Sequence, residues 1–357
     1  MVRIAHISDS HLGSSLFQLI ERREDARICL KKAIEMALRK SPDILVHTGD
    51  VFHSPTPHPE DTNFVVNLLK GISETKVIVL HGNHDVPYGY RYMHSPIWML
   101  ENAGFLVSTG EKDHNVLRHE VDGKVIDIHL VSWTRPLTFR KYIRDFSPSS
   151  DAAVLFSHFL PIDHDEIPSH YDYVGHGHSH NFRLDEDSSI GCPGATCIVD
   201  WKKEIGGKSK LIVVDIDSEG VEFETETLND VREFKFHPGL DISGMGASDA
   251  NDAIKDWLAK LSPKKKGKPI IIMNVNGLVT PETENGINRG ELIDFGESTL
   301  NPLFLHIEPN WQVVGPPEVT LSEPLNIELS LEEYLKQSMK VDSEQVLGEL
   351  KKIKGGK

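Results

Sequence analysis

The chain has 357 residues, of which 39% are hydrophobic and 26% are charged. The length predicts two or three domains. The proportions are those of a globular protein and exclude a disordered chain. The formal net charge of −16 counts against a simple basic nucleic-acid-binding protein. No apolar run approaches membrane-spanning length and no signal segment is recognised, so we expect a cytoplasmic protein with three free thiols.

The first half of the chain alternates apolar runs with helical patterns. Runs rich in Val, Ile and Leu, which are typical of buried strands, occupy residues 2–7, 44–46, 77–80, 125–131 and 152–156. Helical periodicity lies between the early runs, over residues 25–39 and 62–72. The resulting β-α-β-α-β order predicts an α/β layered domain. Two later runs, 211–216 and 221–227, have no helical pattern between them and predict an antiparallel addition.

A second module is expected after a boundary near residues 229–233. Strand, helix and strand patterns begin afresh there, over residues 234–237, 249–261 and 270–275. They predict a small α/β capping domain. The helix is followed by the lysine-rich segment 264–268, which we interpret as a solvated loop. Contact with DNA phosphates is the alternative for this segment.

The end of the chain is expected to be a linker followed by helices. Prolines gather between residues 309 and 324, which is typical of a linker or an irregular strand. Two amphipathic helical patterns follow, over residues 331–339 and 343–353. Their apolar positions could complete a core or bind a partner. The predicted domains are therefore residues 1–230, 231–324 and 325–357.

Histidines are concentrated in the first half of the chain. Of the 19 histidines, 17 lie within residues 1–180, and many stand beside Asp, Asn or Gly where strands are expected to end. Five short motifs lie at such ends: Asp9-Ser10-His11, Gly49-Asp50, Gly82-Asn83-His84-Asp85, Ser157-His158 and Gly175-His176-Gly177-His178. Each motif alone is weak evidence. Because strand-end loops of an α/β sheet lie side by side, their joint occurrence predicts a metal site.

The ordered set of five motifs resembles the calcineurin-like metallophosphoesterase superfamily, whose members hydrolyse phosphate esters with two metal ions. The resemblance implies a metallophosphoesterase β-sandwich flanked by helices. It also implies two Mn²⁺ ions per subunit, although Fe²⁺ or Zn²⁺ would suit the same ligands. By this resemblance Asp50 bridges the two ions. Asp9, His11 and His178 complete one site, and Asn83, His158 and His176 complete the other. His180 is left out of this ligand set.

Two further histidines are expected to take part in catalysis. In the family's pattern His84 faces the scissile phosphate, where it could stabilise charge or protonate the leaving oxygen. His53 stands three positions after Asp50, where serine/threonine phosphatases instead show a Gly-Asp-x-x-Asp-Arg-Gly pattern. This departure counts against a serine/threonine protein phosphatase. It leaves His53 as a proton relay or phosphate contact, with a structural loop histidine as the alternative.

Three segments narrow the resemblance to the Mre-eleven/SbcD nucleases of double-strand-break repair: Gly49-Asp50-Val51-Phe52-His53, Cys192-Pro193-Gly194-Ala195 and Val231-Arg232-Glu233-Phe234. The resemblance implies 3'-5' exonuclease activity on duplex ends and endonuclease activity on single-stranded DNA. It also implies a homodimer and a Rad-fifty-type ATPase bound by the C-terminal helices. Two alternatives stay open: a small-molecule phosphodiesterase or nucleotidase, and a scaffold that mainly tethers DNA ends.

Overall fold

The computed structural model describes residues 1–315 apart from 88–91, 122, 205–206, 208 and 262–266. The predicted helices at 331–339 and 343–353 therefore lie outside the described residues, as do three of the lysines in segment 264–268. The chain divides into two units, of which unit 1 ends at Val231 and unit 2 begins at Arg232.

The early apolar runs of unit 1 form three parallel strands, β1 (Val2–Ile7), β2 (Ile44–His47) and β3 (Lys76–Val79). Helix α1 (Ile20–Arg39) connects β1 to β2, and helix α2 (Pro59–Lys70) connects β2 to β3. Helix α3 (Pro96–Asn102) comes after β3. Strands β10 (Ser209–Ile216) and β11 (Val221–Leu228) extend this sheet in the order β11-β10-β1-β2-β3, and both added pairings are antiparallel. The predicted antiparallel addition is confirmed.

The middle of unit 1 forms a second sheet in the order β4-β5-β6-β7-β9-β8. Its strands are β4 (His114–Val121), β5 (Lys124–Val131), β6 (Ala152–Ser157), β7 (Tyr173–His176), β8 (Arg183–Asp185) and β9 (Ile190–Cys192). Helix α4 (Pro136–Asp145) connects β5 to β6, and the short helix α5 (Trp201–Glu204) precedes β10. Strands β5, β6 and β7 run parallel, so their carboxyl ends lie at one edge.

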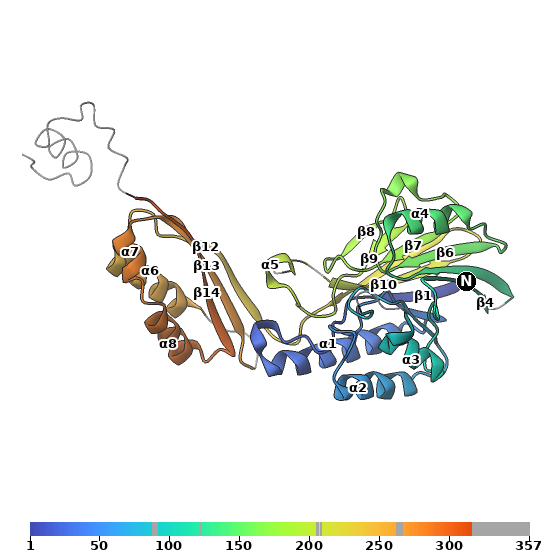
Figure 1. Cartoon of the computed structure of the whole chain (residues 1–357), viewed down its shortest axis with the longest axis horizontal. Coiled ribbons are helices and arrows are strands. Elements are labelled where there is room, and N and C mark those ends of the chain that lie inside the picture. The colour runs from blue at the N-terminus through green and yellow to red at the C-terminus, as the bar shows by residue number, and fades with distance from the viewer. Residues whose placement is uncertain (88–91, 122, 205–206, 208, 262–266, 316–357) are drawn as a thin grey trace, which may run out of the picture. The chain divides into compact units, whose positions relative to one another are not determined.

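The two sheets pack face to face, and helices cover their outer faces (Figure 1). Successive side chains of a strand point to opposite faces, so Ile4 lies in the core between the sheets while Ala5 lies in the core beneath α1. Phe139 and Ile143 of α4 pack on the outer face of the second sheet. The predicted α/β sandwich flanked by helices is confirmed. In the described part of the chain, no helix combines the length and the hydropathy that crossing a membrane requires.

Unit 2 is a three-stranded parallel sheet with helices, in the strand order β12-β13-β14. Its elements are β12 (Phe234–Asp241), α6 (Ala247–Lys260), β13 (Ile270–Val279), α7 (Pro281–Gly286), α8 (Arg289–Leu300) and β14 (Phe304–Val313). The prolines from residue 309 onward predict a linker or irregular strand, but Pro309 lies within β14 opposite Val275. An edge strand tolerates a proline because its missing N–H need not bond a further strand.

Candidate metal centre

The five predicted motifs meet at one edge of unit 1. Strands β1, β2 and β3 of one sheet run parallel to one another, as do β6 and β7 of the other, and each motif lies at or just beyond the carboxyl end of its strand. Loops at the carboxyl ends of parallel strands lie together. Metal-ligand side chains from distant parts of the sequence are therefore brought into one place.

The first ligand group, which we call site A, consists of Asp9, His11 and His180. One ligand atom from each residue lies within 4.8 Å of the others. Nε2 of His11 is 3.0 Å from Nε2 of His180 and 4.0 Å from Oδ1 of Asp9. Two imidazole nitrogens and a carboxylate oxygen thus face a common point.

The second group, site B, consists of Asp50, His158 and His178, together with the amide of Asn83. The three titratable residues offer ligand atoms within 4.8 Å of one another. Oδ1 of Asn83 lies 3.0 Å from Nε2 of His158 and 3.0 Å from Nδ1 of His178. Nδ1 of His158 donates to the carbonyl of Thr48 at 2.8 Å, which leaves Nε2 unprotonated toward the site in a neutral ring.

Asp50 lies between the two groups. Its Oδ2 is 3.6 Å from Nε2 of His11 in site A and 3.6 Å from Nε2 of His158 in site B. Its Oδ1 accepts the backbone N–H of His84 at 2.8 Å, which fixes the carboxylate. One buried carboxylate oxygen therefore faces both ligand groups.

The predicted histidine pair of the last motif is displaced by two residues. The resemblance to the family places His176 and His178 in the ligand set, but the structure brings His178 to Asn83 and His180 to His11. Among the described residues, His176 belongs to none of the ligand groups, and its Nδ1 lies 3.1 Å from the neighbouring carbonyl of Gly177. The reason is that β7 runs up to His176, which still pairs with Ser157, and the chain turns only afterwards.

The backbone of the site is held in an unusual conformation. Asp9, His11, Asp50 and His178 all have positive φ, between 43° and 66°. Such angles are uncommon outside glycine and concentrate at functional sites. Gly82 is required by close packing, because an added Cβ would lie 2.1 Å from Oδ1 of Asp50. The fold thus keeps these loops in place despite a local cost in free energy.

His84 and His53 lie beside site A. Together with His11 they form a third group whose ligand atoms lie within 4.8 Å of one another. The rings of His53 and His84 stack at 5.2 Å, and Nδ1 of His84 lies 2.9 Å from the carbonyl oxygen of His53. That carbonyl can only accept, so Nδ1 of His84 carries the proton and Nε2 is the free position. Both predicted catalytic residues are thus next to the ligand groups.

Burial sets the protonation of the ligands. Burial lowers the pKa of His11 well below its usual value and lowers the pKa of His178 to about 4. These imidazoles are therefore neutral near pH 7 and can donate lone pairs. Burial raises the pKa of Asp9 to about 6. Neutral imidazoles, carboxylates and an amide oxygen are a donor set that suits Mn²⁺, Fe²⁺ or Zn²⁺, so the residues present fit two divalent ions.

Two buried carboxylates hold parts of the site in place. Asp85 accepts backbone N–H groups from Phe52 and Gly82, both at 3.0 Å, and so ties the second and third motif loops together. Glu204 accepts from Nδ1 of His180 at 2.5 Å. Asp85 belongs to a quoted motif, whereas Glu204 lies 24 residues beyond its partner with no motif around it.

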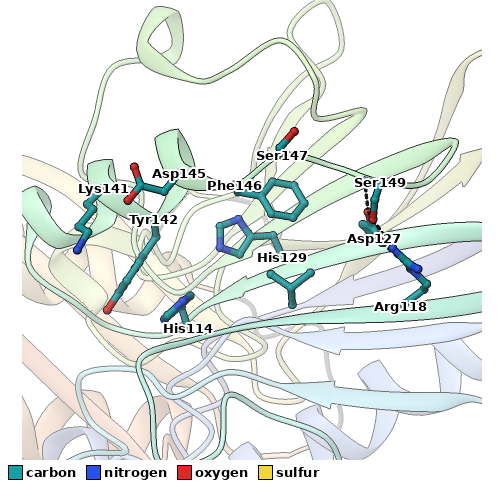
Figure 2. A pocket seen from close by; sticks show the side chains of 11 residues that line it. His114, Arg118, Asp127, His129, Lys141, Tyr142, Asp145, Phe146, Ser147 and Ser149 are labelled. Carbon is teal, nitrogen blue, oxygen red and sulfur yellow. Dashed lines mark hydrogen bonds and ion pairs between the residues drawn. The ribbon is translucent and has the colours of Figure 1, made fainter.

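A cavity of about 660 Å³ lies elsewhere in unit 1, against β4, β5 and α4. Figure 2 shows His129 and Phe146 side by side within it, with His114 and Tyr142 near one end and Arg118 near the other. No residue of site A or site B lines this cavity. The ligand groups therefore do not depend on it.

The profile of the calcineurin-like phosphoesterase family matches residues 2–186, which include the site from Asp9 to His180. The chain belongs to the calcineurin-like phosphoesterase family. The recognition of a metallophosphoesterase from its five motifs is thus confirmed. Among solved structures, a dimetal phosphatase from Danio rerio is 12% identical, with a TM-score of 0.38, over 64% of this chain and 99% of that chain.

Within this phosphoesterase family, the chain is similar to archaeal proteins named DNA double-strand break repair protein Mre11. The protein from Saccharolobus solfataricus is 28% identical over 59% of this chain and 58% of its own length. That from Methanococcus maripaludis is 26% identical over 57% of this chain and 60% of its own length. That from Aeropyrum pernix is 22% identical over 91% of this chain and 84% of its own length. The resemblance to Mre-eleven nucleases is confirmed, while the chain spans less than two thirds of the first two relatives.

Proposed function

We propose that this chain is a two-metal phosphodiesterase that cleaves DNA. The observation that carries the proposal is the placement of Asp50, whose Oδ2 is 3.6 Å from a histidine nitrogen of each ligand group. A carboxylate shared in this way can bridge two cations. Sites for two neighbouring cations are typical of enzymes that hydrolyse phosphate esters by in-line displacement.

The proposed ligands follow the geometry of the two groups. Asp9, His11 and His180 would hold one ion in site A, and Asn83, His158 and His178 would hold the other in site B. Asp50 would serve both. This set contains His180 in place of the predicted His176, because His176 is still paired within β7. We propose Mn²⁺ as the metal of both sites.

The chain's own residues account for positioning and proton transfer. Divalent cations, when bound, supply Lewis acidity toward the phosphate and lower the pKa of a coordinated water. The backbone N–H of His84 is held by Asp50 and its Nδ1 by the carbonyl of His53, so its Nε2 has a fixed direction beside the site. From there a protonated His84 could donate a hydrogen bond to the phosphate or a proton to the leaving oxygen. His53 would support this ring by stacking and by its carbonyl.

DNA as the substrate is supported by the names of the archaeal relatives and not by the metal centre alone. We propose exonuclease activity on duplex ends in the 3'-5' direction and endonuclease activity on single strands. With a net charge of −16, DNA binding would depend on the metal ions and a few basic residues. The proposed partners are a second copy of the chain, paired through α2 and α3, and a Rad-fifty-type ATPase, bound through residues 325–357, which lie outside the described residues.

The test is cleavage by the purified full chain with Mn²⁺ of end-labelled duplex DNA, single-stranded DNA and a small chromogenic phosphodiester. An Asp50→Asn variant controls for contaminating nucleases. The proposal expects metal-dependent cleavage of both DNA forms by the wild-type chain alone. Cleavage of the small diester without cleavage of DNA would favour a small-molecule phosphodiesterase or nucleotidase. No hydrolysis of any substrate, with metal bound, would favour a scaffold that tethers DNA ends.

A further inference from the structure

We propose that Glu204 is a positioning residue for the metal centre, and that it acts by holding the His180 ring with Nε2 turned toward site A. This inference rests on the two-metal function proposed above. It adds to that function a residue that lies outside the five motifs and outside the part of the chain that the family profile matches.

The Glu204 carboxylate is buried and held by several donors. The residue is 6% exposed, at the end of α5. Its Oε1 accepts from Nδ1 of His180 at 2.5 Å and from the backbone N–H of Asp200 at 2.8 Å. Its Oε2 accepts from the backbone N–H of Val199 at 2.8 Å. Because both oxygens are occupied, the carboxylate cannot rotate without losing a hydrogen bond.

The contact fixes how His180 presents its nitrogens. A carboxylate only accepts, so Nδ1 of His180 carries the proton and the lone pair of the neutral ring is on Nε2. That Nε2 lies 3.0 Å from Nε2 of His11, at the centre of site A. A carboxylate behind a ligating histidine also raises the basicity of the ring.

The two sites differ in the group that accepts the Nδ1 proton of a histidine ring. In site B, the corresponding Nδ1 of His158 donates to a neutral backbone carbonyl, that of Thr48. Of these two rings, only that of His180 has a buried carboxylate behind it. Removing the charge of Glu204 should therefore weaken metal binding at site A and leave site B nearly unchanged.

Glu204 could instead serve only to order the segment 199–204, which includes α5. A double-mutant cycle separates the two roles. If Glu204 acts through the imidazole of His180, then its substitution should have no further effect on metal affinity once that imidazole is gone. If Glu204 only orders this segment, its substitution should change metal affinity equally in both backgrounds.

The experiment is titration of the metal-free full chain with Mn²⁺, followed by calorimetry and by electron paramagnetic resonance. The variants are E204Q, H180A, the double variant, and E186Q as a control that neutralises an exposed glutamate. We expect two ions and a spin-coupled pair in the wild-type chain and in E186Q. E204Q should bind the site A ion about 10- to 100-fold more weakly. At low Mn²⁺ its spectrum should be that of an isolated ion in site B.

The outcomes are distinct. Wild-type affinity and a coupled spectrum in E204Q would overturn the inference, as would equal losses in the wild-type and H180A backgrounds. A loss confined to the wild-type background would support it. If the wild-type chain itself bound no pair of Mn²⁺ ions, the proposed function would fail first. Thermal melting of each metal-free variant shows whether it is folded, and E204D, which keeps the charge, should recover part of the affinity if E204Q does not fold.

Discussion

Nε2 of His180 lies 3.0 Å from Nε2 of His11, although 169 positions separate the two residues in the sequence. The contact joins the loop after β1 of one sheet to the loop after β7 of the other. Each imidazole has a carboxylate nearby, since His11 lies 3.6 Å from Asp50 and His180 bonds Glu204 at 2.5 Å. Two nitrogens that face each other inside a carboxylate-lined site are well placed to share a cation.

This contact predicts the effect of removing each histidine of the last motif. His180→Ala should lose one of the two bound Mn²⁺ ions on dialysis, because the loss of one ligand weakens binding at site A. His176→Ala should leave both ions bound, since the His176 ring belongs to neither site in the described structure. Metal analysis of the dialysed variants measures the stoichiometry. Loss of metal from His176→Ala with full occupancy in His180→Ala would restore the ligand set predicted from the sequence.

The displaced histidine pair shows where the sequence ceases to be informative. The segment Gly175-His176-Gly177-His178-Ser179-His180 contains the Gly-His-x-His pattern twice, in registers two residues apart. Which one reaches the metal depends on where β7 stops, and this is set by its pairing with β6. Long-range pairing of this kind is not encoded in local residue patterns.

Other parts of the fold were more accessible to prediction. Apolar runs identify β1, β2, β3, β5, β6 and β10 because these strands are buried by neighbours on both faces. Strand β4 is harder to predict because three of its eight residues are exposed and none is fully buried. Glu204 carries no sequence signal at all, since its role depends on a contact across 24 residues. The motif residues were predictable because glycines and ligand side chains occur together at strand ends.

Asp50 should be required for metal binding, whereas His84 should be required only for catalysis. Asp50→Asn should lose metal from both sites, because one carboxylate oxygen faces both ligand groups. His84→Gln should keep both ions and lose DNA cleavage by about 100-fold or more, the usual contribution of a general acid. Metal analysis and single-turnover cleavage measure the two effects. Equal metal loss in both variants would make His84 a ligand.

Acidification should empty site A before site B. Burial raises the pKa of Asp9 to about 6. Burial alone would lower the pKa of His180, but the Glu204 contact and nearby carboxylates outweigh it and raise this pKa above 6.5. Both groups must lose a proton to bind metal, so each costs about tenfold in affinity per pH unit below its pKa. The pKa of His178 in site B is lowered to about 4, so that ring does not compete near pH 5.5.

Titration with Mn²⁺ at pH 7.5 and at a pH of about 5.5 measures this difference. At the lower pH one ion should bind much more weakly, and buffers of different ionisation enthalpy should report proton release during its binding. An Asp9→Asn variant, which has no such proton to lose, should release fewer protons. Parallel loss of both ions on acidification would show that the two sites titrate together and would contradict the assignment.

The last prediction concerns the stability of unit 1. Arg22 of α1 is 2% exposed, and its guanidinium bonds both oxygens of Asp230, at 3.0 and 2.8 Å. Asp230 also accepts the backbone N–H of Ile198 at 3.0 Å. Its substitution by Asn removes the charge that faces a buried cation, and such losses cost about 3–5 kcal/mol. Asp25, which bonds the same guanidinium at 2.8 Å, should hold the loss near the lower limit.

Urea unfolding of the metal-free chain, followed by circular dichroism, measures this cost. Asp230→Asn should lower the unfolding midpoint of unit 1, while Asp187→Asn, at an exposed turn, should leave it unchanged. An Arg22→Met, Asp230→Asn double variant should be less destabilised than the sum of the two single variants, because each single change removes the same contact between the two side chains. If the double variant is instead less stable than Asp230→Asn by the full cost of Arg22→Met, the two residues contribute independently and the ion pair does not stabilise the unit.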